Sequence, residues 1–119
     1  MADSIIMIKS YSFALRIVNA YKYLIEEKRE FVLSKQMLRS GTSIGAMVRE
    51  SKFAQSKSDF INKLSIGLKE ANETMYWMDL LHDSGYIEEG VYLSIRNDCD
   101  EIVSILAAIV KTSKETLNS

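Results

Sequence analysis

Residues 37–57 read MLRSGTSIGAMVRESKFAQSK, and the fold can be worked out from this stretch. Its inward-facing residues recur at steps of three and four, the period that keeps one face of an α-helix buried. They are Met37, Gly41, Ile44, Val48 and Lys52. A glycine inside a helix costs about 1 kcal/mol relative to alanine, so a helix that contains Gly41 and Gly45 needs the space that they leave. The stretch therefore predicts a helix that packs closely against a neighbouring helix.

Small side chains give this helix a surface of low relief. The packing surface that we expect, within one chain or between subunits, comprises Ser40, Gly41, Ser43, Ile44, Gly45 and Ala46. The alternative is that the run SGTSIGA forms a phosphate-binding loop. No strand-like run precedes it and no Gly-Lys-Ser/Thr sequence closes it, so that motif is incomplete. We therefore interpret the small residues as a helix-packing feature.

The composition predicts an all-α protein with a single domain, residues 1–119. The chain has no proline, five glycines and 47% hydrophobic residues, which suits a few long helices joined by short turns. The single cysteine, Cys99, is expected in the core of a protein from a reducing compartment. The N-terminus lacks a signal-peptide pattern, and the longest apolar segment is far shorter than the roughly 20 residues of a spanning helix. We expect a soluble cytoplasmic protein without membrane contact.

Four helices are predicted, over residues 5–27, 33 or 34 to 55, 57 to just before 85, and 88–113. Ser34 is placed to cap the second helix, and Ser56 and Asp59 have the spacing of a capping box before the third. A continuous bend between these two helices fits as well as a turn does. Gly85 suits a left-handed residue after the third helix. Short connections force neighbouring helices to be antiparallel, so the expected architecture is an up-down-up-down four-helix bundle.

The first predicted helix has an apolar face wide enough for two neighbours. Its main stripe comprises Met7, Tyr11, Ala14, Val18, Tyr21 and Ile25. Its second stripe comprises Phe13, Ile17, Ala20 and Leu24. The inward face of the third helix comprises Phe60, Leu64, Leu68, Ala71, Met75, Met78 and Leu81 or His82. That of the fourth comprises Val91, Ile95, Cys99, Ile102, Leu106 and Ile109.

The net charge of −1 hides an asymmetry between the two parts of the chain. Residues 1–69 contain 12 Lys/Arg and 6 Asp/Glu, whereas residues 70–119 contain 3 and 10, so the parts carry +6 and −7. This polarity indicates either a basic face for nucleic acid or complementary faces for self-association. Alternatively, antiparallel helices place the two parts side by side and the charges partly cancel. The EEKRE run at residues 26–30 is expected to be a solvated connection.

No group of side chains predicts catalysis. Glu70 and Glu73 lie three apart, but carboxylate-bridged di-metal bundles also need Glu-x-x-His pairs, and the only histidine is His82. Asp79, His82 and Asp83 share a helix turn, which is more typical of a solvated helix end than of a metal site. No nucleophile is placed beside a base and an oxyanion donor. We therefore expect no enzyme activity, no cofactor and no metal.

A structural role suits the central carboxylates better. Glu50, Glu70 and Glu73 are expected to pair with Arg39, Lys63 or Lys69 and to fix the register of the second and third helices. The complete polar network that we predict comprises Arg39, Glu50, Glu70, Glu73 and Tyr76.

The run QMLRSGTSIGAMVRESKFAQSKSDFINKLSIGLKEANETMYWMDLL, residues 36–81, closely resembles the bacterial four-helix bundle proteins related to those encoded in 23S ribosomal RNA intervening sequences. The match covers the two central helices strongly and the outer two by pattern. Where this chain has Met47, the family usually has Asn. The positions that match characteristic residues of the family are Arg39, Ser43, Ile44, Glu50, Phe60, Glu70, Glu73 and Tyr76.

Similar bundles include the accessory variability protein of diversity-generating retroelements, a homopentamer that binds a reverse transcriptase and nucleic acid. The resemblance implies a non-enzymatic homo-oligomer, a pentamer, that acts as an accessory module to RNA, a ribonucleoprotein or a reverse transcriptase. The phosphate contacts that we expect are Lys35, Arg39, Arg49, Lys52, Lys57 and Lys63. The alternative is a protein-interaction scaffold with no nucleic-acid role, in which the oppositely charged parts bring subunits together.

Overall fold

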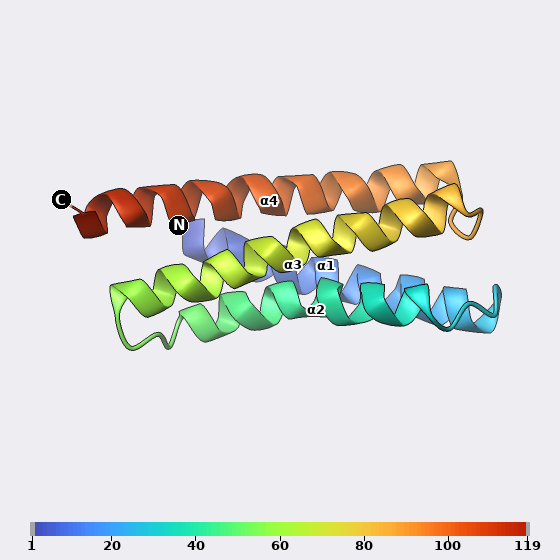
Figure 1. The fold of residues 1–119 in the computed structure, drawn as a ribbon, viewed down its shortest axis with the longest axis horizontal. Helices are drawn as coiled ribbons and strands as arrows, with labels where there is room; N and C mark the ends of the chain where they lie inside the picture. The colour runs from blue at the N-terminus through green and yellow to red at the C-terminus, as the bar shows by residue number, and fades with distance from the viewer. Residues whose placement is uncertain (1, 119) are drawn as a thin grey trace.

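Four helices make up the structure, a computed structural model that describes residues 2–118. They are α1 (Ala2–Glu26), α2 (Leu33–Ser51), α3 (Lys57–Asp83) and α4 (Glu89–Asn118), and the described residues contain no strand, which confirms the all-α prediction. Figure 1 shows that each helix runs opposite to the one before it, so the α2–α3 turn lies at the same end as both termini. The molecule is 51 Å long, close to the span of about 45 Å expected for a 30-residue helix such as α4.

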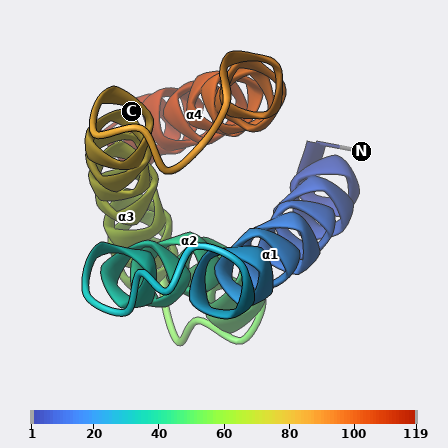
Figure 2. The ribbon, with the colours of Figure 1, turned by 90° about the vertical axis from the view of Figure 1, so that its right-hand side faces the viewer.

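The helices surround one core. Each helix contacts two neighbours, in the order α1, α2, α3, α4 and back to α1, as the end-on view of Figure 2 shows. In that view α1 and α4 are inclined to each other, and they pack less closely than the other three neighbouring pairs do. The largest fully buried side chains include Phe13, Ile17, Leu24, Met37, Ile44, Leu64, Met78, Leu81, Ile102 and Leu106.

The buried face of α1 is not the main stripe that the sequence predicted. Tyr11, a member of that stripe, is 57% exposed. The core is built from the second stripe, extended toward the N-terminus. Both stripes fit the helical period, so the choice between them depends on where α2 and α4 lie and not on α1 alone. The buried residues of α1 are Ile6, Ser10, Phe13, Ile17 and Leu24.

Glu30 corrects the expectation that residues 26–30 are a solvated connection, because it is only 8% exposed. Its carboxylate accepts hydrogen bonds from the backbone amides of Val32, Leu33 and Ser34, at 3.1, 3.0 and 2.6 Å. Amides in the first turn of a helix have no partner within the helix, so Glu30 caps α2. The prediction that Ser34 is the cap is wrong: its hydroxyl donates to the Glu30 carbonyl oxygen at 2.6 Å. Arg29, at φ 55°, turns the chain so that Glu30 faces the helix.

A turn, not a continuous bend, separates α2 from α3. α2 ends at Ser51, four residues before the predicted boundary, and backbone hydrogen bonds of 3.0–3.2 Å fold the next residues back onto its last turn. The Ser56 hydroxyl oxygen accepts the Asp59 amide at 3.0 Å, which confirms the predicted cap and the start of α3 at Lys57. The Asp59 carboxylate accepts the Gln55 amide at 3.2 Å, one residue earlier than in the standard capping box.

The α3–α4 connection follows the prediction, whereas the two helices differ from it in detail. Gly85 has φ 87°, the left-handed conformation expected after α3. α4 extends to Asn118 instead of residue 113, its buried face includes Val110, and Val91 is exposed. In α3 the predicted Phe60, Leu68 and Met75 flank the core. The buried positions of α3 are Ile61, Leu64, Gly67, Ala71, Thr74, Met78 and Leu81.

Candidate nucleic-acid interface

Two glycines bring α2 close to α1. A Cβ atom on Gly41 would lie 2.8 Å from Ile17 Cγ1, and one on Gly45 would lie 3.3 Å from the Ser10 carbonyl oxygen. The first distance is far below the roughly 3.5 Å at which carbon atoms are in favourable contact. The predicted small-residue surface therefore packs within the chain, with α1 as its neighbour at both glycines.

The other small residues of α2 lie around this contact. Ser40 and Ile44 are buried, the Ser43 hydroxyl donates to the Arg39 carbonyl oxygen at 2.6 Å, and Ala46 is exposed. Met47, at the position where the family usually has Asn, faces α3, and its Cβ would lie 3.5 Å from a Cβ built on Gly67. The small-residue surface is thus largely used within the chain.

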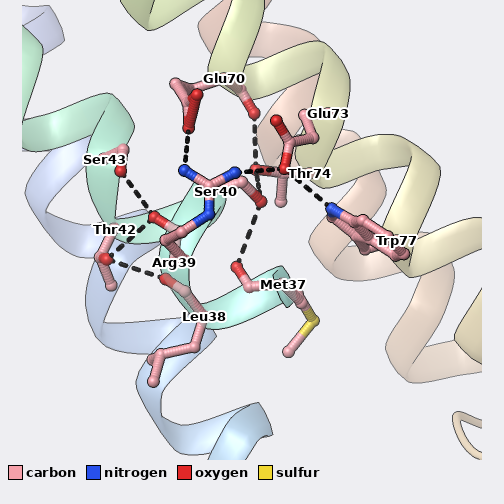
Figure 3. Close-up of polar contacts among 10 residues, drawn as sticks. All are labelled: Met37, Leu38, Arg39, Ser40, Thr42, Ser43, Glu70, Glu73, Thr74 and Trp77. Atoms are coloured by element: carbon pink, nitrogen blue, oxygen red, sulfur yellow. Dashed lines mark hydrogen bonds and ion pairs between the residues drawn. The ribbon is translucent and has the colours of Figure 1, made fainter. Parts of the chain in front are cut away.

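Arg39 joins α2 to α3 (Figure 3). Its guanidinium donates to the Glu70 carboxylate at 3.4 Å and to the Glu73 carboxylate. Glu73 also accepts a hydrogen bond from the Trp77 indole N–H at 3.0 Å. The Trp77 hydrogen bond and then the Arg39 contact hold the pKa of Glu73 below its ordinary value, against the opposing effect of burial. The structure thus brings together three of the residues that were predicted to fix the register.

The remaining members of the predicted network lie at its edges. Lys63 Nζ contacts a Glu50 carboxylate oxygen at 3.2 Å. The Tyr76 side chain is exposed and packs edge-on against Trp77, with ring centroids 5.0 Å apart. Among the described residues, the Tyr76 hydroxyl has no hydrogen-bond partner. Glu50 therefore belongs to a separate ion pair, and Tyr76 contributes packing instead of polar contacts.

The six basic residues predicted to contact phosphate fall into three groups. Arg39 and Lys63 are paired with carboxylates. Lys35 is exposed near the start of α2, at the end away from the termini. Three others lie together at the end with the α2–α3 turn, and none has an acidic partner within residues 2–118. They are Arg49, Lys52 and Lys57, and we call this end of the bundle the basic end.

The two ends of the bundle differ in charge. Lys111 and Lys114 of α4 add to the basic end, where the only acids among the described side chains are Glu115, Asp59 and the Glu50 already bound by Lys63. The opposite end has an excess of acids, and the two are separated by most of the 51 Å length, several times the Debye length of about 8 Å in physiological salt. Its charged residues are Glu26, Glu27, Glu30, Asp83, Glu88 and Glu89, against Lys28, Arg29 and Lys35.

A cavity of about 450 Å³ opens at the basic end. Lys52 and Lys57 lie on its lining. Phe53, in the turn between them, is 80% exposed. Sequence reasoning missed Phe53; its one signal is a large aromatic residue placed between two lysines in a turn. The apolar lining comes from all four helices and comprises Ile6, Met7, Val48, Phe60, Leu64 and Ile109.

The residues considered for metal binding have other partners. Asp79 accepts hydrogen bonds from the Tyr92 hydroxyl at 2.5 Å and from Arg96 at 2.6 Å. His82 contacts Asp83 at 3.1 Å, and its ring stacks on Tyr92 with centroids 4.1 Å apart. These contacts tie the end of α3 to the start of α4. Asp79, His82 and Asp83 therefore have a structural role in this connection.

Cys99 has the surroundings of a core residue. It is fully buried, and its thiol donates to the Ala71 carbonyl oxygen at 3.5 Å. Burial raises the pKa of the Cys99 thiol to about 12. The thiolate is the reactive form of cysteine, so this side chain is not poised as a nucleophile near neutral pH.

The fold and the site define a four-helix protein with one basic and one acidic end. The chain belongs to the 23S rRNA-intervening sequence protein family, whose family model matches residues 2–108. Its structure is similar to that of a protein of unknown function from the S23 ribosomal protein family of Bacteroides thetaiotaomicron. The two chains are 58% identical with a TM-score of 0.92, over 93% of this chain and 99% of the other. No curated protein matches the chain.

The sequence predicts no membrane-spanning segment. Within residues 2–118, none of the four helices combines the length and the hydrophobicity that crossing a bilayer requires.

Proposed function

We propose that the protein is a non-enzymatic, homo-oligomeric module of the cytoplasm that binds RNA, as an accessory to a ribonucleoprotein or a reverse transcriptase. The observation that supports RNA binding is the basic end, three exposed cations without acidic partners among the described residues. Phosphate groups supply such partners. Membership in the 23S rRNA-intervening sequence protein family and the resemblance to a reverse-transcriptase partner support the accessory role.

RNA binding is tested by its dependence on salt. Each phosphate contact with a single strand contributes about −0.7 to the slope of log K against log salt, so the three cations predict a slope near −2. The affinity of a labelled RNA should be measured by fluorescence anisotropy between low and physiological salt. Absent binding, or a flat line, contradicts the proposal.

The oligomer is supported by the surface of α1. This helix is apolar on most of its circumference, and such helices are ordinarily buried on more than one side. A run of exposed apolar side chains on one protein suits an interface with another copy. They are Ile5, Ile8, Tyr11, Leu15 and Tyr23. The pentamer itself is supported by the resemblance.

Light scattering at low and high salt, with absorbance at 260 and 280 nm, tests the oligomer. We expect a salt-resistant mass near five times 13.5 kDa, because apolar contacts are not screened, together with co-purified nucleic acid. A monomer at all concentrations contradicts this part of the proposal.

The second candidate function is a scaffold without a nucleic-acid role. The observation that favours it is the opposite charge of the two ends, which can attract a protein partner or another subunit. The scaffold predicts an oligomer free of nucleic acid whose mass falls as salt rises. The same light-scattering measurement therefore separates the two functions.

A further inference from the structure

Phe53 is the most exposed of the large hydrophobic side chains within the described residues, at 80%. It is displayed by an ordered turn: its amide donates to the Glu50 carbonyl oxygen at 3.0 Å, and the neighbouring amides bond the last turn of α2 in the same way. Contact between water and an apolar ring of this size is unfavourable. A ligand that covers the ring removes that contact and is stabilised by doing so.

The surroundings of Phe53 indicate what that group is. Lys52 precedes it directly, Lys57 begins α3 four residues later, and Arg49 is on the preceding turn of α2. None of these cations has an acidic partner in the part of the chain that the structure describes. An exposed aromatic ring among free cations is complementary to a ligand that combines flat apolar rings with phosphates.

The cavity beside the turn adds a second feature. Its volume of about 450 Å³ is of the size that accommodates small-molecule ligands, and Lys52 and Lys57 line it together with the hydroxyl-bearing Ser51 and Ser56. The Ser51 hydroxyl donates to the Val48 carbonyl oxygen at 2.6 Å, but its oxygen can still accept. An apolar floor with cations and hydroxyls on its lining suits a single unstacked nucleobase.

We propose that the basic end selects single-stranded RNA over duplex RNA. One base stacks on the Phe53 ring, the adjacent base enters the cavity, and Arg49, Lys52 and Lys57 contact the phosphates between and beside them. Bases within a duplex are already stacked on both faces and cannot reach either position. This inference rests on the proposed RNA binding and adds the strand preference and the residue that produces it.

The test compares two phenylalanines that are exposed at opposite ends of α2. Phe53→Ala removes the stacking ring, whereas Phe31→Ala removes an exposed ring at the acidic end and serves as the matched control. Binding of a labelled oligonucleotide of about 12 nucleotides, single-stranded or annealed to its complement, is measured by fluorescence anisotropy. We expect Phe53→Ala to weaken single-strand binding by about 5- to 100-fold with little effect on the duplex, and Phe31→Ala to change neither by more than about twofold.

Charge variants separate stacking from phosphate contact. In the double variant Lys52→Gln/Lys57→Gln the slope of log K against log salt should become less steep by about 1.4, while Lys28→Gln, an exposed change at the acidic end, should leave it unchanged. Phe53→Ala should lower the affinity without changing the slope. Circular dichroism melts confirm that each variant is folded.

The outcomes distinguish this inference from the proposed function. If the wild type binds neither RNA form, the proposed function itself fails. If it binds RNA with a normal salt slope but holds duplex as tightly as single strand, or if Phe53→Ala binds as the wild type does, RNA binding stands and the strand preference is wrong. A lower mass of Phe53→Ala in light scattering identifies Phe53 as a subunit contact and also overturns the inference.

Discussion

The Glu30 carboxylate holds the N-terminus of α2 by accepting three backbone amides from one helical turn. Burial by itself raises the pKa of this carboxyl, but the hydrogen bonds from Leu33, Ser34 and Val32 outweigh it, and the pKa lies below its usual value of 4.5. The folded protein therefore binds fewer protons at Glu30 than the unfolded chain does in acid. This contribution to stability is complete above pH 4.5 and is lost as the pH falls through the folded-state pKa.

We predict that Glu30→Ala lowers the free energy of unfolding by about 1–2 kcal/mol at pH 7, the usual cost of losing a helix cap. The difference from the wild type should shrink as the pH falls from 4.5 through the folded-state pKa of Glu30, because the protonated carboxyl group is a weaker acceptor for the backbone amides. Urea denaturation at pH 7 and pH 3 measures both values, with Glu27→Ala as an exposed control in the same connection. An equal loss at both pH values would show that the charge of Glu30 has no part in capping.

At the level of the helices, the approach of α2 to α1 depends on Gly41. A Cβ atom there would lie 2.8 and 2.9 Å from the two γ-carbons of Ile17, a fully buried β-branched side chain with little rotamer freedom. We predict that Gly41→Ala is destabilising by up to about 2 kcal/mol, because overpacking exceeds the roughly 1 kcal/mol gained in helix propensity.

Gly67 of α3 is the matched control for this prediction. A Cβ atom on it would lie no closer than 3.5 Å to any neighbour, so Gly67→Ala should stabilise by up to about 1 kcal/mol. Both changes are measured by urea denaturation. If both variants were stabilised, helix propensity, and not packing against Ile17, would decide their stability.

Between α2 and α3, two hydroxyl groups meet inside the otherwise apolar core. Thr74 Oγ1 lies 2.9 Å from Ser40 Oγ and 2.8 Å from the Glu70 carbonyl oxygen, and both side chains are fully buried. Because a hydroxyl has one proton, Thr74 donates to the carbonyl and accepts from Ser40.

We predict that Thr74→Val costs about 1–2 kcal/mol, since it leaves the Ser40 hydroxyl with only a long 3.4 Å contact to the Met37 carbonyl oxygen. The double variant with Ser40→Ala should lose less than the sum of the two single changes, because both partners are then apolar. A thermodynamic double-mutant cycle measures this coupling. Strict additivity would show that the two hydroxyls do not interact.

For the whole molecule, the helical periods along the chain, the capping residues and the short connections were enough to predict four helices and most of their boundaries. Three features could not be predicted, because they depend on contacts between distant segments: which stripe of α1 is buried, that Glu30 folds back onto α2, and that Phe53 is exposed. The distribution of charge over the surface could not be predicted either, for the same reason. The basic and acidic parts of the chain lie side by side, with Arg39 paired to Glu70 and Arg16 2.6 Å from Asp98, so a net difference remains only between the two ends.

We expect the subunits to meet through the exposed apolar side chains of α1. Ile8 and Leu15 lie two helical turns apart on one side and are 66% and 50% exposed, so replacing both by glutamine should leave the fold of the single chain unchanged. Each such side chain buried in an interface stabilises it by about 1.5–3 kcal/mol, and every subunit of a ring would lose both. We therefore expect Ile8→Gln/Leu15→Gln to have the circular dichroism spectrum of the wild type and the light-scattering mass of a monomer. Leu93→Gln, an exposed position on α4, is the control and should keep the oligomer. If the double variant also keeps the wild-type mass, the subunits meet through another face, and the exposed apolar side chains of α1 need a different partner.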